Sequence, residues 1–275
     1  MPHLITDQKT DTVFFSKLVK EKPCYNELKA ALDKHQVNHF LLSYTKDIWA
    51  RDYMPIQLSE STFLQYRYQP DYLQDKPQYR TNPTKSLQSL KLETVKTDLI
   101  IDGGNVIKCT DSVLMTEKVF FENPNYSKIE IAQKLENLFE CEIFFLPWDM
   151  EEFYGHADGM IRYLGGNQLL MNHFSSFDPQ IHNQMLKLLG HRFDLVELHF
   201  EGYLNPEFNW AYINYLQVGN LVLLPRMDIF EDYQALQQFQ SLFPCSALET
   251  IDVTSLVKDG GALNCISWNI KSNLN

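Results

Sequence analysis

A histidine and an aspartate stand two residues apart in the run Gly155-His156-Ala157-Asp158-Gly159. Residues i and i+2 of an extended strand point to the same face, so both side chains are predicted to face one cavity. The flanking glycines let another group approach the backbone closely. An imidazole beside a carboxylate therefore indicates a site that moves protons or binds a cation.

Cys265 follows two glycines at 260–261 and is the candidate nucleophile. Its thiolate would be the reacting form, with His156 as the proton partner. The sequence has no Cys-x-x-Cys pair, and its odd number of widely spaced cysteines predicts a reducing, cytoplasmic location. The remaining four are expected to be small buried hydrophobes: Cys24, Cys109, Cys141 and Cys245.

Carboxylates decide which substrate such a thiol would attack. Asp52, Asp102 and Asp158 all lie in polar or glycine-rich stretches. Three acids near one thiol suit a planar cation such as guanidinium, whose N–H groups pair with carboxylate oxygens. The net charge of −11 also favours cationic ligands and argues against nucleic acid. The peptide substrates of a Cys/His amidase or protease would offer no such cation.

Simpler interpretations exist for each stretch. His156 and Asp158 could bind a metal with His173, but no second His or Cys stands at a ligand spacing, so no metal is predicted. The run at 102–105 could be a bare turn, and it lacks the pattern of a phosphate-binding loop. The run at 49–52 could be a structural ion pair beside a packed indole.

The elements that would position these residues repeat along the chain. One family of apolar strand-like segments starts about every 45 to 60 residues, a spacing typical of repeated supersecondary units. Its members are residues 37–42, 98–101, 142–146, 193–198 and 247–251. A second family keeps the same step at 63–66, 112–116, 168–172 and 220–224. Helical periodicity is found at 15–32, 129–139, 181–189 and 233–243.

A polar turn separates the two strands of each unit. In chain order these turns carry Asp52, then Asp102, then His156 with Asp158, then Asn214, then Cys265. We therefore predict an α/β fold in which five blades close into a ring and the polar turns converge on its axis. The alternative is an ordinary mixed α/β domain. Either way a single domain is expected over residues 1–275.

The stretch 69–83 is predicted to be a long irregular insertion, and loops of this length are often lids or binding loops. Arg67, before the insertion, and Arg80, within it, could anchor a substrate carboxylate, but the interpretation as surface arginines is slightly favoured. The sequence has no apolar run of the roughly 20 residues needed to span a bilayer, and its first residues do not resemble a signal peptide.

Six motifs occur in a fixed order. They are Trp-Ala-Arg-Asp-Tyr-Met-Pro at 49–55, Asp-Gly-Gly-Asn at 102–105, Thr-Glu at 116–117 with Asn-Pro at 123–124, Gly-His-Ala-Asp at 155–158, Tyr-Ile-Asn at 212–214 and Gly-Gly-Ala-Leu-Asn-Cys at 260–265. In this order they resemble the agmatine deiminase and bacterial, Porphyromonas-type peptidylarginine deiminase family. That family belongs to the guanidino-modifying enzymes, whose fold is a pseudo-symmetric five-bladed α/β propeller, the pentein.

The resemblance implies a role for each matching residue. Cys265 would attack the guanidinium carbon, and His156 would act as general acid and base. Asp102 stands where relatives carry a glutamate and would orient the histidine. The remaining matches would bind the substrate: Asp52 and Asp158 through guanidinium nitrogens, Trp49 as a channel wall, and Asn214 as a polar neighbour.

The implied reaction is hydrolysis of a small guanidino compound, agmatine or a related arginine derivative, through a covalent amidino-thioether on Cys265. It gives a ureido product and ammonia and needs no cofactor. Asn264, Met54 and Asp102 depart from the family pattern. Open alternatives are methylarginine hydrolysis, amidino transfer, peptidylarginine deimination and a non-catalytic propeller that binds a partner protein. The resemblance also suggests a homodimer.

Overall fold

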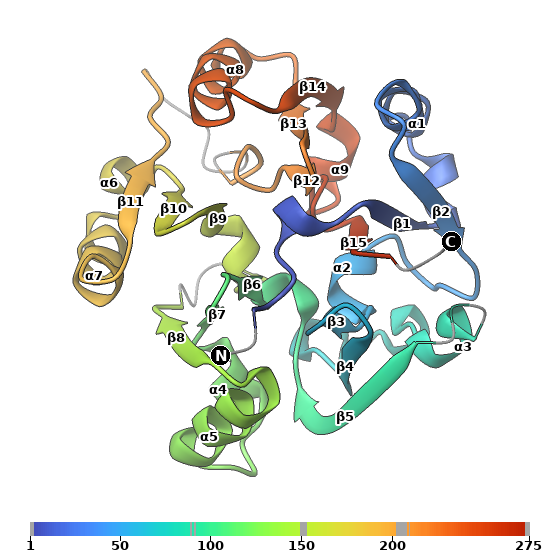
Figure 1. Ribbon diagram of the computed structural model, residues 1–275, viewed down its shortest axis with the longest axis vertical. Helices are drawn as coiled ribbons and strands as arrows, with labels where there is room; N and C mark the ends of the chain where they lie inside the picture. The colour runs from blue at the N-terminus through green and yellow to red at the C-terminus, as the bar shows by residue number, and fades with distance from the viewer. Residues whose placement is uncertain are drawn as a thin grey trace.

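Five three-stranded sheets stand around a common centre in the computed structural model, with helices at their outer edges (Figure 1). The structure describes residues 3–88, 90, 92–148, 153–201, 208 and 210–272. In every sheet the inner strand is antiparallel to the middle strand, and the outer strand is parallel to it. The five-bladed α/β propeller predicted from the repeat is therefore confirmed.

Each blade contains an inner, a middle and an outer strand. In this order the blades are β3 (Ile56–Gln57), β4 (Thr62–Arg67) and β5 (Glu93–Ile100); β6 (Ile107–Lys108), β7 (Ser112–Thr116) and β8 (Glu142–Leu146); β9 (Ile161–Gly165), β10 (Gln168–Met171) and β11 (Asp194–Glu197); β12 (Leu216–Val218), β13 (Leu221–Arg226) and β14 (Ala247–Asp252); and β15 (Ser267–Ile270), β1 (Thr12–Ser16) and β2 (Asn38–Leu42).

The helices lie between the strands of a blade or in the turns between blades. They are α1 (Tyr25–Lys34), α2 (Ala50–Tyr53), α3 (Pro83–Leu87), α4 (Lys118–Glu122), α5 (Lys128–Phe139), α6 (Phe174–Phe177), α7 (Pro179–Leu189), α8 (Glu231–Leu242) and α9 (Thr254–Lys258). Short 3₁₀ turns cover Asp7–Lys9, Lys17–Glu21, Asp71–Leu73, Pro77–Tyr79, Gly103–Asn105 and Ala157–Gly159.

The middle strands are the most apolar because both of their faces are covered. Every residue of β1 and β7 is buried, whereas β2 alternates between exposed and half-buried positions along most of its length. Continuous apolar runs are expected for strands that are buried on both faces. Both predicted strand families are confirmed, the first as the outer strands and the second as four of the five middle strands.

Three of the four predicted helices are confirmed. The apolar stripe at 129–139 forms α5, in which Ile131, Leu135 and Phe139 are buried. Ser127 and Glu130 form a reciprocal capping box at its first turn, which satisfies backbone donors that a helix leaves unpaired. The ranges 181–189 and 233–243 correspond to α7 and α8.

The predicted helix at 15–32 is wrong in its first half. Residues 12–16 form β1, a 3₁₀ turn follows, and only Tyr25–Lys34 is α-helical. Pro23 precedes this helix in a turn, where its missing N–H costs nothing. The helical periodicity was misleading because β1 is stabilised by a partner strand that lies far away in sequence.

That partner is β15, which closes the ring. β15 pairs antiparallel with β1, so that Thr12 lies opposite Ile270 and Phe14 opposite Trp268. Neither strand was predicted. The first and the last strands of the chain thus share one blade, seen in Figure 1 where the blue and red ribbons meet.

A polar network occupies the ring axis. Arg162 donates a hydrogen bond from Nη2 to Asp7 Oδ2 at 2.7 Å, and Asn269 Nδ2 donates to Asp7 Oδ1 at 3.0 Å. Arg51 Nη2 in turn donates to Asn269 Oδ1 at 2.6 Å. These contacts connect the segment before β1, the blade of β9 and the strand β15, so they hold the two ends of the chain to the centre.

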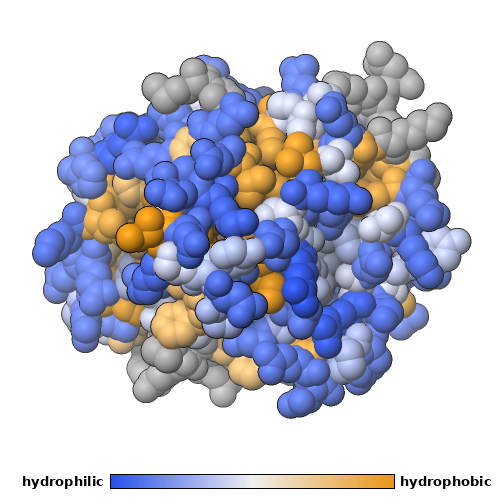
Figure 2. Space-filling model, turned by 90° about the horizontal axis from the view of Figure 1, so that it is seen from below, coloured by the Kyte–Doolittle hydropathy of each residue, from blue (hydrophilic) through white to orange (hydrophobic). Residues whose placement is uncertain are grey.

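The surface seen from below is mainly hydrophilic, with apolar side chains in small separate places (Figure 2). Within the described part of the chain, every helix is too short or too polar to cross a lipid bilayer.

Candidate functional site

The five polar turns meet at one end of the ring axis. Each follows the carboxyl end of an outer strand, and because the outer strands run in the same sense in every blade, the turns share one face. A cavity of about 1140 Å³ opens there. Its lining includes six of the seven predicted site residues, which are Trp49, Asp52, His156, Asp158, Asn214 and Cys265. The seventh, Asp102, lies directly behind His156 and is 1% exposed.

The turn at 102–105 connects three neighbouring parts of the site. Asp102 Oδ2 lies 3.0 Å from His156 Nε2. Gly104 donates its N–H to Asp52 Oδ1 at 3.1 Å, and Asn105 Oδ1 accepts the Ala157 N–H at 3.2 Å. A Cβ on Gly104 would come within 2.7 Å of both the Asp52 carboxylate and the imidazole, so a side chain has no space there.

The predicted extended strand through His156 and Asp158 is wrong in its local form. His156 has an extended backbone, but a 3₁₀ turn begins immediately after it at Ala157. The two side chains still line the same cavity, as predicted. The turn is stabilised from outside by Asn105, whose contact the sequence pattern of 155–159 did not indicate.

The imidazole of His156 lies between two carboxylates. Its Nε2 contacts Asp102, and its Nδ1 lies 3.6 Å from Asp52 Oδ1. Burial lowers the pKa of this histidine, but Asp52 and Asp102 outweigh burial and raise the pKa to about 9. The ring is therefore an imidazolium at neutral pH and can donate from both nitrogens.

At Asp52, burial and the neighbouring negative charges outweigh the cationic His156, so the pKa of this carboxyl group is raised. Burial raises its pKa to about 7, His156 opposes this shift, and the charges of Asp102 and Asp158 add to it. Asp52 is only 6% exposed. A cation that entered the cavity would offset this repulsion, so the carboxylate would become fully ionised when such a ligand binds.

Cys265 is held by its backbone and faces a carboxylate. Its N–H donates to Asn214 Oδ1 at 3.2 Å, and its Sγ lies 3.7 Å from Asp158 Oδ2. Burial raises the pKa of the thiol well above its usual value, and Asp158 and Asp52 raise it further. Asn264 donates to the same Asp158 oxygen at 2.7 Å. The departure at position 264 thus supplies a donor that orients Asp158.

Two aromatic rings account for the glycines before Cys265. A Cβ on Gly261 would come within 2.2 Å of the Trp49 indole, and one on Gly260 would come within 2.5 Å of the Tyr154 hydroxyl. Gly260 also has a φ of +93°, which favours glycine. Both rings form part of the cavity wall, as predicted for Trp49.

The insertion at 69–83 also reaches the cavity. It contains two 3₁₀ turns, and Tyr72 from the first of them lines the wall close to His156. Arg67 and Arg80 do not line this cavity. Arg67 is exposed and donates to Gln69, while Arg80 borders a separate pocket of about 620 Å³. They are not positioned to bind a substrate carboxylate in the cavity.

Sequence reasoning missed Lys118, the first residue of α4. Its Nζ lies 3.8 Å from Asp102 Oδ2, directly behind the imidazole. A lysine directly before the apolar run Val119-Phe120-Phe121 was the available signal. The described residues hold no cluster of metal ligands, and His173 Nδ1 contacts the Leu198 carbonyl.

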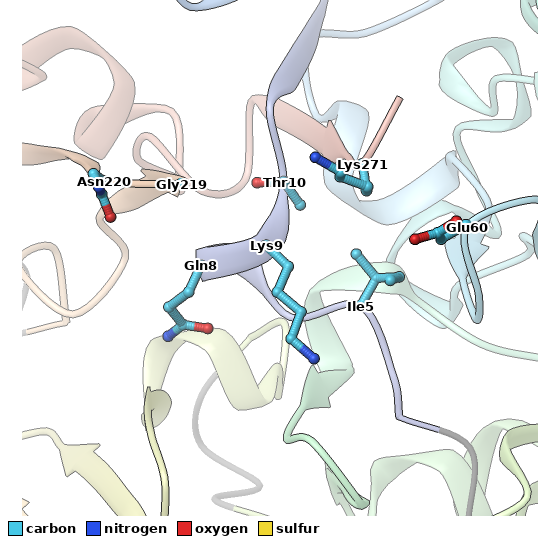
Figure 3. A pocket seen from close by; sticks show the side chains of 8 residues that line it. All are labelled: Ile5, Gln8, Lys9, Thr10, Glu60, Gly219, Asn220 and Lys271. Atoms are coloured by element: carbon cyan, nitrogen blue, oxygen red, sulfur yellow. The ribbon is translucent and has the colours of Figure 1, made fainter. Parts of the chain in front are cut away.

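Another pocket, of about 430 Å³, lies at the other end of the axis (Figure 3). Its wall includes Glu60 from the β3–β4 hairpin and Gly219 with Asn220 from the β12–β13 hairpin, on either side of the segment before β1. The hairpins join the ends of the strands opposite the polar turns. No predicted site residue lines this pocket.

The family model of Porphyromonas-type peptidyl-arginine deiminase matches residues 9–270. The chain belongs to this family. All six sequence motifs of the site fall inside the matched range, so the family membership predicted from them is confirmed.

One similar protein is a provisionally named agmatine deiminase from Mycoplasma mycoides. It is 23% identical to this chain over 220 residues, which cover 66% of this chain and 60% of that protein. The chain thus spans less than two thirds of that relative's length.

Solved structures extend the likeness of the fold over the full chain. An agmatine deiminase from C. jejuni with substrate bound has a TM-score of 0.79 at 18% identity, covering 100% of this chain and 98% of the other. An amidinotransferase from Microseira wollei has a TM-score of 0.64 at 10% identity, with the same coverage. At these identities the likeness concerns the fold.

Proposed function

We propose that this protein is a hydrolytic deiminase of a small guanidino compound, agmatine or a close relative. The observation that supports this most is the shared cavity of one thiol, one imidazole and two aspartates, Asp52 and Asp158. Such carboxylates match the N–H groups of a guanidinium, and Asp158 would hold that cation beside the Cys265 sulfur.

The substrate itself would activate the nucleophile. In the free protein, burial and the charges of Asp158 and Asp52 raise the pKa of the Cys265 thiol. A guanidinium bound between these carboxylates offsets their charge, so the pKa of the thiol falls when the substrate arrives. The thiolate then forms next to the carbon that it attacks.

The reaction would proceed in two steps. The Cys265 thiolate adds to the guanidinium carbon, the His156 imidazolium protonates one amino group, and ammonia leaves an amidino-thioether on sulfur. The neutral imidazole then removes a proton from water, and the hydroxide attacks the same carbon. The C–S bond breaks and the hydroxyl group loses its proton to solvent, which gives a ureido compound and restores the thiolate and the imidazolium.

The remaining residues would position these groups. Asp102 orients the imidazole through Nε2, and Asn214 fixes the Cys265 backbone. The rings of Trp49 and Tyr72 line the cavity and would cover the alkyl chain of the substrate, which shields the bound substrate from bulk solvent. We keep the cytoplasm as the proposed location, because all five cysteines carry free thiols.

The test is product formation on a panel of guanidines. Purified protein is incubated with agmatine, arginine, methylated arginine, guanidino acids and an arginyl peptide, and ammonia, methylamine and ureido products are measured. Ammonia with an equal amount of ureido product from a small guanidine is the expected result. Methylamine, product only from the peptide, or turnover only after an amine acceptor is added would reassign the substrate or the reaction.

Cys265→Ala is the matched variant. It is expected to lose all turnover and still bind agmatine in calorimetry, because Asp52 and Asp158 remain. Cys245→Ala, at an exposed cysteine, is the control and should keep full activity. Turnover that survives in Cys265→Ala would exclude the covalent mechanism. If the folded wild-type protein released no product from any compound of the panel, the alternative of a non-catalytic propeller that binds a partner protein would be favoured.

A further inference from the structure

Lys118 is a buried lysine outside the proposed reaction steps. Its side chain is 1% exposed, and it is not part of the cavity wall. Lysines are almost never fully buried unless they are paired. The pairing of this ammonium therefore indicates what it does.

The ammonium contacts two separate parts of the molecule. On the side of the imidazole, Nζ lies 3.8 Å from Asp102 Oδ2 and 3.7 Å from Glu122 Oε1. On the side of the insertion, it lies 3.0 Å from Asp71 Oδ1 and 4.7 Å from the centre of the Tyr72 ring. It also donates to the Tyr154 carbonyl at 2.6 Å.

The acids around Lys118 need this cation. Asp102 Oδ1 and Glu122 Oε1 are buried and have no hydrogen-bond partner among the described residues. Burial and the charge of Asp102 raise the pKa of Glu122, and Lys118 opposes this rise, so the two acids cannot both stay ionised without the cation. Burial lowers the pKa of Lys118, but Asp102, Glu122 and Asp71 outweigh this effect and raise it, so the lysine stays charged.

We propose that Lys118 is a positioning residue that holds Asp102 against His156 and fastens the insertion at 69–83 over the cavity. Through Asp102 it sets the charge around the imidazole, and through Asp71 it keeps Tyr72 in the cavity wall. The catalytic part of this inference rests on the proposed deiminase function, in which His156 moves protons.

The charge balance gives the direction of the effect. The charged groups near the imidazole are Asp52 from α2, Asp102, Asp158 from its own turn, and Glu122 and Lys118 from α4. Asp71 from the insertion contacts Lys118 on the side away from the ring. The rings of Tyr72 and Tyr154 and the thiol of Cys265 complete its surroundings. Lys118 is the sole cation in this set, and it lowers the pKa of His156.

Removal of Lys118 should therefore raise the pKa of His156 further, by roughly one unit for a lost charge at this range. The imidazolium, which already dominates at neutral pH, would then be a weaker acid. The first reaction step, in which it protonates the departing amino group, would slow.

The first experiment follows the His156 ring by NMR titration in the free protein, with His156→Asn to assign the signal. Lys118→Met is expected to raise the titration midpoint by roughly one pH unit. Lys118→Arg, which keeps the charge, should leave it close to the wild-type value. An unchanged midpoint in folded Lys118→Met, or an equal shift in Lys118→Arg, would overturn the proposal.

The second experiment separates the two contacts by steady-state kinetics. Asp71→Asn removes an exposed partner on the insertion, so KM should rise severalfold while the pH profile and the His156 midpoint stay unchanged. Lys118→Met should move the pH profile as well. If Asp71→Asn leaves KM unchanged, the fastening role is wrong.

These readouts separate the two proposals. If the wild-type protein produced no ammonia from any guanidine, the deiminase function would fail while the NMR titration would still test Lys118. If the protein turned over and the His156 midpoint did not respond to Lys118→Met, the function would stand and the role of Lys118 would fail.

Discussion

Two aspartates at opposite ends of the ring axis differ in how the chain supplies a cation for them. Asp7, at the hairpin end, contacts the Arg162 guanidinium at 2.7 Å. Although burial raises its pKa, Arg162, Arg51 and Lys108 lower it below the usual value. Among the described residues, Asp52 at the turn end has one ion-pair partner, the His156 ring at 3.6 Å, and its pKa is raised to about 7.

The difference shows how one architecture serves two purposes. At the hairpin end the protein uses its own guanidinium to pair a carboxylate, and the result is a fixed centre. At the turn end Asp52 and Asp158 line an open cavity, where a guanidinium ligand would make the pairing that Arg162 makes elsewhere. Residues at the first end should govern stability, and those at the second should govern chemistry.

The largest expected effect is on stability at the hairpin end. Arg162→Met leaves Asp7 without its ion pair and removes the guanidinium that stacks 4.3 Å from the Tyr215 ring. The free energy of unfolding should fall by about 3 kcal/mol, as when one partner of a buried pair is removed. Urea denaturation measures this. A loss below about 1 kcal/mol would contradict the assignment of this end as structural.

The matched variant at the turn end is Asp52→Asn. Because the folded pKa of Asp52 lies above its usual value, the contribution of this aspartate to stability is complete below about pH 4 and is lost as the pH rises through about 7. Asp52→Asn lacks this loss, so it should be equal to the wild type at pH 4 and more stable at pH 8. Urea midpoints at both pH values test the sign.

The next effect is on the reactivity of the thiol. Asp158→Asn removes a charge that raises the pKa of Cys265, so alkylation by iodoacetamide at pH 7 should accelerate by about tenfold for each unit of pKa lost. Turnover should fall in the same variant. Mass spectrometry quantifies the modification, with Cys245 as an internal standard and Asp178→Asn, elsewhere in the cavity wall, as the control.

The pH profile of kcat/KM is the third expectation. The thiolate–imidazolium pair carries one proton fewer than the free protein at neutral pH, so kcat/KM should rise with pH and level off near pH 9, where His156 loses its proton. Below about pH 7 the slope should steepen, because Asp52 becomes protonated. Asp102→Asn should move the levelling point to lower pH, and a flat profile would contradict the assignment of His156.

The smallest effect is expected at the pocket of about 430 Å³ at the hairpin end of the axis. Lys271 lines it and forms a partly exposed ion pair with Asp11 at 2.8 Å. Exposed pairs of this kind contribute little. Lys271→Ala should change neither the urea midpoint nor the turnover of guanidines. A marked loss of turnover would mean that the two ends of the axis are coupled.

Much of the fold was predictable because burial leaves a local trace. The middle strands β7, β10 and β13 are apolar along their length, as expected for strands that are buried on both faces. The polar turns recur between the apolar strands at a regular spacing in the sequence. The positions of Cys265, Asp52 and Asp158 follow from that step. Their common cavity is a consequence of the ring and needs no further information.

Other features depend on contacts that no local pattern encodes. The last two residues of β1 are read as the start of a helix until β15 is placed beside the strand, more than 250 residues later. Lys118 resembles a surface lysine until α4 is packed against Asp102 and the insertion. The 3₁₀ turn after His156 likewise depends on Asn105, which belongs to another blade.

The pairing of β1 with β15 also sets the order in which the parts of the site are completed during synthesis. On a growing chain, each of the other four blades can pair its strands as soon as they emerge, because its three strands are consecutive in sequence. β1 is made first and waits for β15, which follows Cys265 by two residues. Cys265 and the strand that closes the ring are therefore synthesised together, and a partly synthesised chain contains Asp52 and Asp158 before it contains Cys265.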